Sequence, residues 1–180
     1  MYGIVNKSIE DLVVANFGQD KWDAIHLRSG VDIDFFLSNE IYDDDVTYKI
    51  ATAVSEEMDM SLNDVLVTFG EWWVMRTTKD KYPGLLESGG NNLRDFLVNL
   101  PNFHNRVMLI YPKLSPPEFK VTDVEEAGLH LHYFSKREGL QDFVRGILQG
   151  LGQLYNAPVT LELLQSRNEG SSHEIFKINW

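Results

Sequence analysis

The feature that most constrains the fold is a change in the spacing of apolar residues near position 115. Before that point, apolar residues recur at helical spacings between short polar connections. From SPPEFKVTD onward, short runs such as LHLHYFSKR, VTLELLQS and HEIFKINW alternate with a period near two, as strands do. One helix, from about Glu138 to Tyr155, separates the first two of these runs. The pattern predicts an α+β fold, with helices followed by an antiparallel sheet of about four strands that contains one inserted helix.

Capping residues predict where several helices of the first half begin and end. Ser8 and Gly18 suit the start and end of a first helix, and Gly30 suits the end of a second. Ser61 suits the start of a later helix, because Asp64 follows it at the spacing of a capping box. The stretch NNLRDFLVNLPNFHNRVMLIYP contains Pro101 near its middle, and proline is typical of the first turn of a helix. This segment therefore predicts two successive helices, the second beginning at Pro101.

Length and charge bound the domain organisation and the partners. The 180 residues, 43% of them apolar, suffice for a single domain over residues 1–180 with a sizeable core. A formal charge of -11 makes nucleic acid an unsuitable partner, because phosphate backbones are repelled. The chain has neither a leader-like segment nor an apolar run of about 18 residues. We therefore expect a cytoplasmic protein with no membrane partner.

The absence of cysteine leaves histidines and carboxylates as the only strong metal ligands. The acidic run YDDD at Tyr42 to Asp45 suits the first turn of a following helix better than a cation site. His130 and His132 lie two apart on one expected strand and could share a zinc ion, but the sequence identifies no third ligand. Solvent-facing histidines are the simpler interpretation of this pair.

Three hydrogen-bonding side chains alternate along the first strand-like run, namely Tyr133, Ser135 and Arg137. Residues two apart project from the same face of a strand, so the three side chains are expected to converge on one patch. Two hydroxyls and a positively charged guanidinium suit a ligand that bears carboxylates. By itself, however, an alternating polar face is more often the solvated side of a sheet.

His104 is expected to point inward from the helix that follows Pro101. It lies at helical spacings from apolar residues that would form one stripe, Leu100, Val107, Met108 and Tyr111. A lone inward histidine is more often a core residue with satisfied hydrogen bonds than a ligand. The surrounding motifs therefore decide how it is interpreted.

The motifs LPNFH, LSPPEF and YFSKREGLQDFVRGI, in this order, resemble those of H-NOX domains. This haem nitric oxide/oxygen-binding family includes the beta subunit of soluble guanylate cyclase. The opening MYGIVNKSIEDLV, the central FGEWWV and the C-terminal QSRNEGSSHEIFKI fit the same family, so the resemblance covers essentially the whole chain. It implies an H-NOX fold in which haem b lies buried between the helical part and the sheet.

The resemblance also implies a role for each matching position. His104 matches the proximal ligand of the haem iron, and Pro117 matches the proline that presses on the porphyrin and distorts it. The propionates of the haem would be bound by Tyr133, Ser135 and Arg137. Further residues expected to contact the haem or its edge are Tyr2, Ile4 and Leu140.

The distal side of the haem decides which gas is held, because bound oxygen needs a hydrogen-bond donor more than nitric oxide does. Oxygen-binding members of the family resemble one another in having a distal tyrosine, and the matching residue here is Phe143. A buried hydrogen bond contributes roughly 1 kcal/mol, so its absence could weaken oxygen binding about tenfold. Trp73 matches a position near the distal face, and its indole N–H could supply a donor. Val74 and Ile147 are the other expected residues of the gas pocket.

These expectations predict a sensor and not an enzyme. Ferrous haem would bind nitric oxide or carbon monoxide, the iron–His104 bond would weaken, and the freed helix would change the surface presented to a partner. No nucleophile elbow, phosphate loop or H-E-x-x-H motif is present. The family commonly regulates a histidine kinase, a diguanylate cyclase or a guanylate cyclase. Two alternatives stay open: an oxygen or redox haem sensor that uses Trp73, and a cofactor-free protein-interaction module.

Overall fold

The computed structural model describes all 180 residues and has helices and strands in the predicted order. The helical part consists of α1 (Gly3–Phe17), α2 (Gln19–Ser29), α3 (Asp44–Met58), α4 (Leu62–Trp72), the π-helical η1 (Trp73–Thr78), α5 (Lys79–Lys81), α6 (Pro83–Glu87) and α7 (Leu93–Ile110). The second part consists of β1 (Glu118–Thr122), β2 (Gly128–Phe134), α8 (Gln141–Leu154), β3 (Thr160–Gln165), the 3-10 turn η2 (Arg167–Glu169) and β4 (Glu174–Asn179). The predicted α+β class is confirmed.

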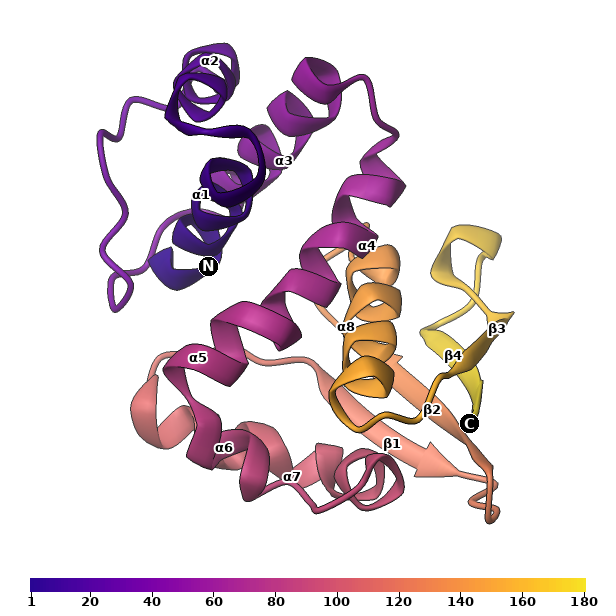
Figure 1. Cartoon of the computed structure of the whole chain (residues 1–180). Coiled ribbons are helices and arrows are strands. Elements are labelled where there is room, and N and C mark those ends of the chain that lie inside the picture. Colours follow the sequence, from indigo (N-terminus) through magenta and orange to yellow (C-terminus); the bar gives the residue numbers. More distant parts are fainter.

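The four strands form one antiparallel sheet in the order β1-β2-β4-β3. Leu131 and Tyr133 of β2 are buried, whereas His130 and His132 are partly exposed, as the period of two predicts. The buried face packs against α8, and α1, α2 and α3 form a separate group on the other side of α4 (Figure 1). The inserted helix therefore covers the sheet, and α4 lies between this unit and the N-terminal helices.

Most of the predicted helix ends are confirmed by the backbone. α1 ends before Gly18, and α2 ends at Gly30, whose φ of 63° lies in the left-handed region that glycine adopts readily. α4 begins after Ser61, whose hydroxyl accepts a hydrogen bond from the amide of Asp64. The acidic run opens α3, so its carboxylates do lie in the first turn of a helix.

The prediction that Ser8 caps α1 is wrong. The helix begins at Gly3, and Ser8 is fully buried within it, where its hydroxyl forms a hydrogen bond with that of Thr77. The first turn is held instead by backbone bonds, because the amides of Gly3 and Ile4 donate to carbonyls of the loop before α3. Those long-range bonds satisfy free helix amides without a side-chain cap, and no local sequence signal reveals them.

The predicted break at Pro101 is also wrong, because α7 is one continuous helix with this proline inside it. Proline removes one helical hydrogen bond and normally costs stability in a helix interior. Leu97 and Leu100 before the proline are buried, and His104 after it lines the same interior. Packing of these residues on one side therefore outweighs the local cost of the exposed Pro101.

Helices α4 and α8 approach each other closely at two glycines. A Cβ atom on Gly70 would lie 2.3 Å from the carbonyl oxygen of Phe143, and one on Gly146 would lie 2.0 Å from that of Val67. No side chain larger than hydrogen fits at either place. This contact places Phe143 beside the end of α4 and hence beside Trp73.

Buried apolar side chains form two clusters. One joins α7, α8 and the sheet through residues such as Leu97, Leu148 and Phe176, and the other joins the N-terminal helices and α4 through residues such as Ile25 and Phe69. No helix combines the length and the apolarity that crossing a bilayer requires.

Candidate cofactor-binding site

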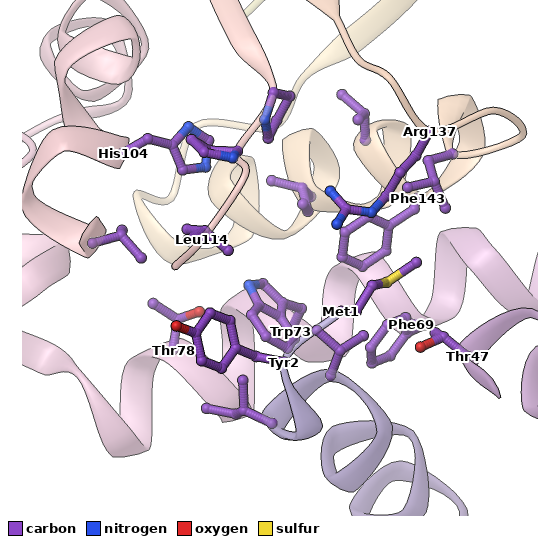
Figure 2. Close-up of a pocket in the computed structure, with 18 of the residues that line it drawn as sticks. Met1, Tyr2, Thr47, Phe69, Trp73, Thr78, His104, Leu114, Arg137 and Phe143 are labelled. Carbon is purple, nitrogen blue, oxygen red and sulfur yellow. The ribbon is translucent and has the colours of Figure 1, made fainter. Parts of the chain in front are cut away.

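A cavity of about 690 Å³ lies where the N-terminal helices, α4, α7, α8 and the sheet meet. Most of its wall is hydrophobic, and its volume falls within the range of small-molecule and cofactor sites. Figure 2 shows His104 at one side of the cavity and Trp73 at the other. All the site residues predicted from the sequence line this cavity: Tyr2, Ile4, Trp73, Val74, His104, Pro117, Tyr133, Ser135, Arg137, Leu140, Phe143 and Ile147.

His104 extends into the cavity from α7. Its ring stacks on that of Phe119 in β1, with centroids 5.6 Å apart and planes 10° from parallel. Burial lowers the pKa of His104 from 6.5 to about 4, and no hydrogen bond or nearby charge contributes to this shift. The imidazole is therefore neutral near pH 7, which is the form that ligates a metal.

Tyr133, Ser135 and Arg137 form a polar edge of the cavity. Tyr133 is buried on β2, and burial raises the pKa of its phenol, which stays protonated as a hydrogen-bond donor. The prediction that all three lie on one strand is wrong, because β2 ends at Phe134, where its pairing with β1 ends at Glu118. Ser135 and Arg137 lie in the following loop and still face the cavity.

Arg137 already binds a carboxylate in this structure. Its Nε and Nη2 atoms lie 2.7 and 3.3 Å from the two carboxylate oxygens of Asp44, and its Nη1 donates to the carbonyl of Ser115 at 3.0 Å. Burial alone would raise the pKa of Asp44, but hydrogen bonds from the amino group of Met1 and from Arg137 outweigh it and hold the pKa low. The cavity edge is therefore suited to a carboxylate.

Asp44 is a cavity residue that sequence reasoning missed. The only signal was the acidic run, which is explained by the start of α3 and gave no hint of a partner 93 residues away. Asp44 is at once a first-turn residue and the ion partner of Arg137. The interpretation of the acidic run as the first turn of a helix was therefore correct, but it did not include the ion pair with Arg137.

The wall opposite His104 is aromatic. Phe143 stacks on Phe69 with centroids 5.1 Å apart, and Trp73 meets both rings edge to face at 6.0 and 6.3 Å. Figure 2 shows the indole nitrogen of Trp73 at the ring edge nearest His104. Phe69 was not predicted, because an aromatic residue at helical spacing is indistinguishable in sequence from ordinary core.

His130 and His132, which the sequence offered only as a less favoured zinc pair, form separate contacts. His130 contacts Asp123 at 2.9 Å, whereas His132 contacts His173 at 3.0 Å. No group of three or more potential ligands exists anywhere in the chain. The two strand histidines thus belong to separate surface contacts.

The residues around the cavity fit haem. The mostly apolar wall suits the porphyrin, the neutral His104 suits the iron, and donors at one edge suit the propionates. The ion pair with Asp44 shows that Arg137 can bind a carboxylate bidentately.

Comparison with known proteins supports the same interpretation. A family model described as haem-NO-binding matches residues 2–163. Soluble guanylate cyclases gcy-31 and gcy-32 of Caenorhabditis elegans are 26% and 29% identical over 100% and 96% of this chain. The chain spans about a quarter of the length of each, 26% in both cases.

Solved structures share the whole fold. An H-NOX protein from S. oneidensis in the Fe(II)NO ligation state superposes with a TM-score of 0.91 at 20% identity, covering 99% of this chain and 98% of that one. An Fe(II) unliganded H-NOX protein from K. algicida gives 0.87 at 26% identity, covering 99% and 96%. The predicted H-NOX fold is confirmed, and the chain belongs to the haem-NO-binding family as a gas-sensing domain of the H-NOX type.

Proposed function

We propose that this chain, as a single domain over residues 1–180, binds haem b and senses nitric oxide, and also carbon monoxide, to regulate a partner signalling enzyme. The observation that carries the proposal is the half-buried, neutral His104, which faces an aromatic wall across an apolar cavity. Haem b is favoured because covalent haem attachment requires cysteines, and the chain has none.

Each part of the cavity has a task in this proposal. His104 ligates the iron, Pro117 presses on the porphyrin, and Tyr133, Ser135 and Arg137 hold the propionates. Apolar contacts come from Tyr2, Ile4 and Leu140, which line the same cavity. When bound, ferrous haem would supply an open coordination position for a diatomic gas.

Selectivity for nitric oxide over oxygen is attributed to the distal wall. Phe143 cannot donate a hydrogen bond, and its neighbours Phe69, Val74 and Ile147 are equally apolar. Bound oxygen would therefore lack the donor that stabilises its partial negative charge. Nitric oxide on ferrous iron depends much less on such a donor.

The signal is proposed to pass through α7. Release of His104 from the iron would free the helix that carries it, which ends in the exposed Leu109 and Ile110. A gas can shift this equilibrium only by the difference between its affinities for the two shapes. The partner would be a cyclase or a histidine kinase, and the cyclase option is supported by the full-length relatives, which are named as cyclases.

A second candidate is an oxygen or redox sensor. It is favoured by one observation, the indole nitrogen of Trp73 at the ring edge nearest His104. Since an indole N–H can donate, Trp73 could take the place of a distal tyrosine. The two candidates differ in whether an oxygen complex of the reduced protein persists in air.

Absorption spectra of the haem-loaded, reduced protein test the proposal, recorded before and after nitric oxide, carbon monoxide and air. We expect a five-coordinate ferrous spectrum, new bands with both gases and no lasting oxygen complex. His104→Gly should lose haem unless imidazole is supplied. A persistent oxygen complex would favour the Trp73 candidate, and a protein that takes up no haem would favour a cofactor-free interaction module.

A further inference from the structure

Arg167 forms hydrogen bonds with the backbone of the loop that carries Ser135 and Arg137. It lies in η2, between β3 and β4, and is largely buried. Its Nη1 donates to the carbonyl of Ser135 at 2.8 Å, and its Nη2 donates to the carbonyl of Arg137 at 3.0 Å. One planar guanidinium thus spans Lys136, the residue between them.

Glu174 holds this guanidinium in place. The Nε atom of Arg167 lies 2.9 and 3.0 Å from the two carboxylate oxygens of Glu174, whose side chain is only 3% exposed. Glu174 is the first residue of β4 and pairs with Tyr133 in the sheet. The guanidinium carbon also lies 6.0 Å from the centre of the Tyr133 ring.

Side chains also hold this loop, because the amide of Arg137 donates to the hydroxyl of Ser135 at 3.0 Å and the Arg137 guanidinium binds Asp44 and the carbonyl of Ser115. No backbone-to-backbone hydrogen bond outside the regular elements involves residues 135–139. Apart from Arg167, its backbone carbonyls receive one side-chain bond, from the hydroxyl of Tyr48 to Glu138 at 2.8 Å. Gly139 has a φ of 70°, so the loop turns sharply just beyond this point. Arg167 is thus the one side chain that binds the backbone carbonyls of both Ser135 and Arg137.

We propose that Arg167 is a positioning residue for the cofactor carboxylates, a role that rests on the proposed haem function. It touches neither the cavity nor the haem in this proposal, because it acts through two backbone carbonyls of the loop. Arg167 also connects the β3–β4 hairpin with the propionate edge of the cavity. A displacement of Arg137 would therefore displace Arg167 and its partner Glu174 at the start of β4.

The test compares haem b with its dimethyl ester, in which both propionates are blocked. Arg167→Lys keeps a positive charge beside Glu174 but cannot donate to both carbonyls from a planar fork. We expect haem b to dissociate from this variant about tenfold faster than from the wild type, a change typical of residues that support a ligand-binding residue. The rate is measured as transfer of haem to excess apomyoglobin. With the dimethyl ester, the same substitution should change the rate less than about twofold.

Arg28→Lys serves as the matched control, because Arg28 also pairs with glutamates but lies on α2, away from the cavity. It should leave both rates unchanged. A second variant, Arg167→Met with Glu174→Gln, removes the ion pair without leaving a buried charge and should act like Arg167→Lys. Circular dichroism of the haem-free proteins checks that each variant is folded.

The outcomes separate this inference from the proposed function. An equal acceleration for haem b and for the ester would mean a general loosening of the fold and would overturn the positioning role. Unchanged rates for both folded variants would overturn it as well, while haem binding by the wild type would keep the proposed function intact. A wild-type protein that binds no haem would overturn both.

Discussion

At the scale of single residues, the cavity sets the chemistry of His104 and Phe143 through their surroundings. His104 is neutral because burial opposes its charged form, not because a partner withdraws its proton. Phe143 presents only carbon atoms to the cavity, and it is locked between Phe69 and Trp73. His104 therefore stays neutral because little water surrounds it, and Phe143 offers the gas no hydrogen-bond donor.

Replacing Phe143 by tyrosine should strengthen oxygen binding by the haem-loaded protein. A distal hydroxyl would donate to bound oxygen, and a hydrogen bond worth roughly 1 to 1.5 kcal/mol corresponds to about tenfold in affinity. The oxygen affinity of the reduced protein, measured by titration, checks this. Phe143→Leu, which adds no donor, is the control. Unchanged affinity in Phe143→Tyr would show that Trp73 already supplies the dominant donor or that residue 143 does not face the gas.

The haem-free protein should become less stable as the pH falls from about 6.5 towards 4. In the unfolded chain His104 binds a proton near its ordinary pKa of 6.5, whereas in the folded chain it stays neutral down to about 4. Its contribution is therefore complete above 6.5 and decreases as the pH falls, by up to about 3 kcal/mol at pH 4. Urea unfolding at several pH values measures it. His104→Leu should flatten that part of the profile, and an unaltered slope would contradict the lowered pKa of the His104 imidazole.

At the scale of elements, the contact between α4 and α8 controls the distal wall. The two helices can approach because Gly70 and Gly146 have no side chain, and this closeness brings Phe143 against Phe69 and Trp73. The π-helical turn at the end of α4 lies at the same place and contributes Trp73 and Val74 to the cavity. Such turns are often found at functional sites.

Gly146→Ala should destabilise the protein by roughly 1 to 3 kcal/mol, the usual cost of forcing extra volume into a packed interface. The new Cβ would lie 2.0 Å from the carbonyl oxygen of Val67, so the helices must separate. Thermal and urea unfolding measure the loss. Gly84→Ala is the control, because nothing lies within 4 Å of its Cβ position, and it should be neutral or slightly stabilising. Equal stabilities of the two variants would mean that the α4–α8 contact is not tightly packed.

At the scale of the whole molecule, the cavity separates two apolar clusters that each have their own buried residues. Its lining extends along the chain from Met1 to Leu151, so a bound cofactor would contact both the helical part and the sheet part. Polar bonds such as that between Arg137 and Asp44 cross the cavity edge, and α4 packs directly on α8. A ligand that fills the cavity should therefore join the two parts.

Haem should raise the stability of the whole chain and not only of one part. Binding to the folded state alone contributes about 4 kcal/mol when free haem is near a thousand times its dissociation constant. Hydrogen exchange of haem-free and haem-loaded protein should show slower exchange in both α1 and α7. His104→Gly without imidazole is the control and should show a smaller effect. Protection confined to α7 would contradict a cofactor that joins both parts.

Much of the fold was predictable because its signals are local. Gly18, Gly30 and Ser61 mark helix ends through backbone geometry and capping, and the period of two marks the strands. The predictions at Ser8 and Pro101 were wrong because distant contacts outweigh local preference. Ser8 is held by a hydrogen bond to Thr77, and Pro101 lies in a helix whose other face is buried. Local signals fail where distant contacts supply more free energy than the backbone preference does.

The sequence by itself determined the fold class, the family and the set of residues that would meet around a cofactor. Those follow from apolar spacing and from motifs that a short stretch of chain carries. Only the tertiary structure decided that Arg137 pairs with Asp44, that Phe69 completes the distal wall and that Arg167 holds the loop after β2. Each of these contacts joins residues that are far apart in the chain, and pairing, burial and charge between distant residues exist only once the chain has folded.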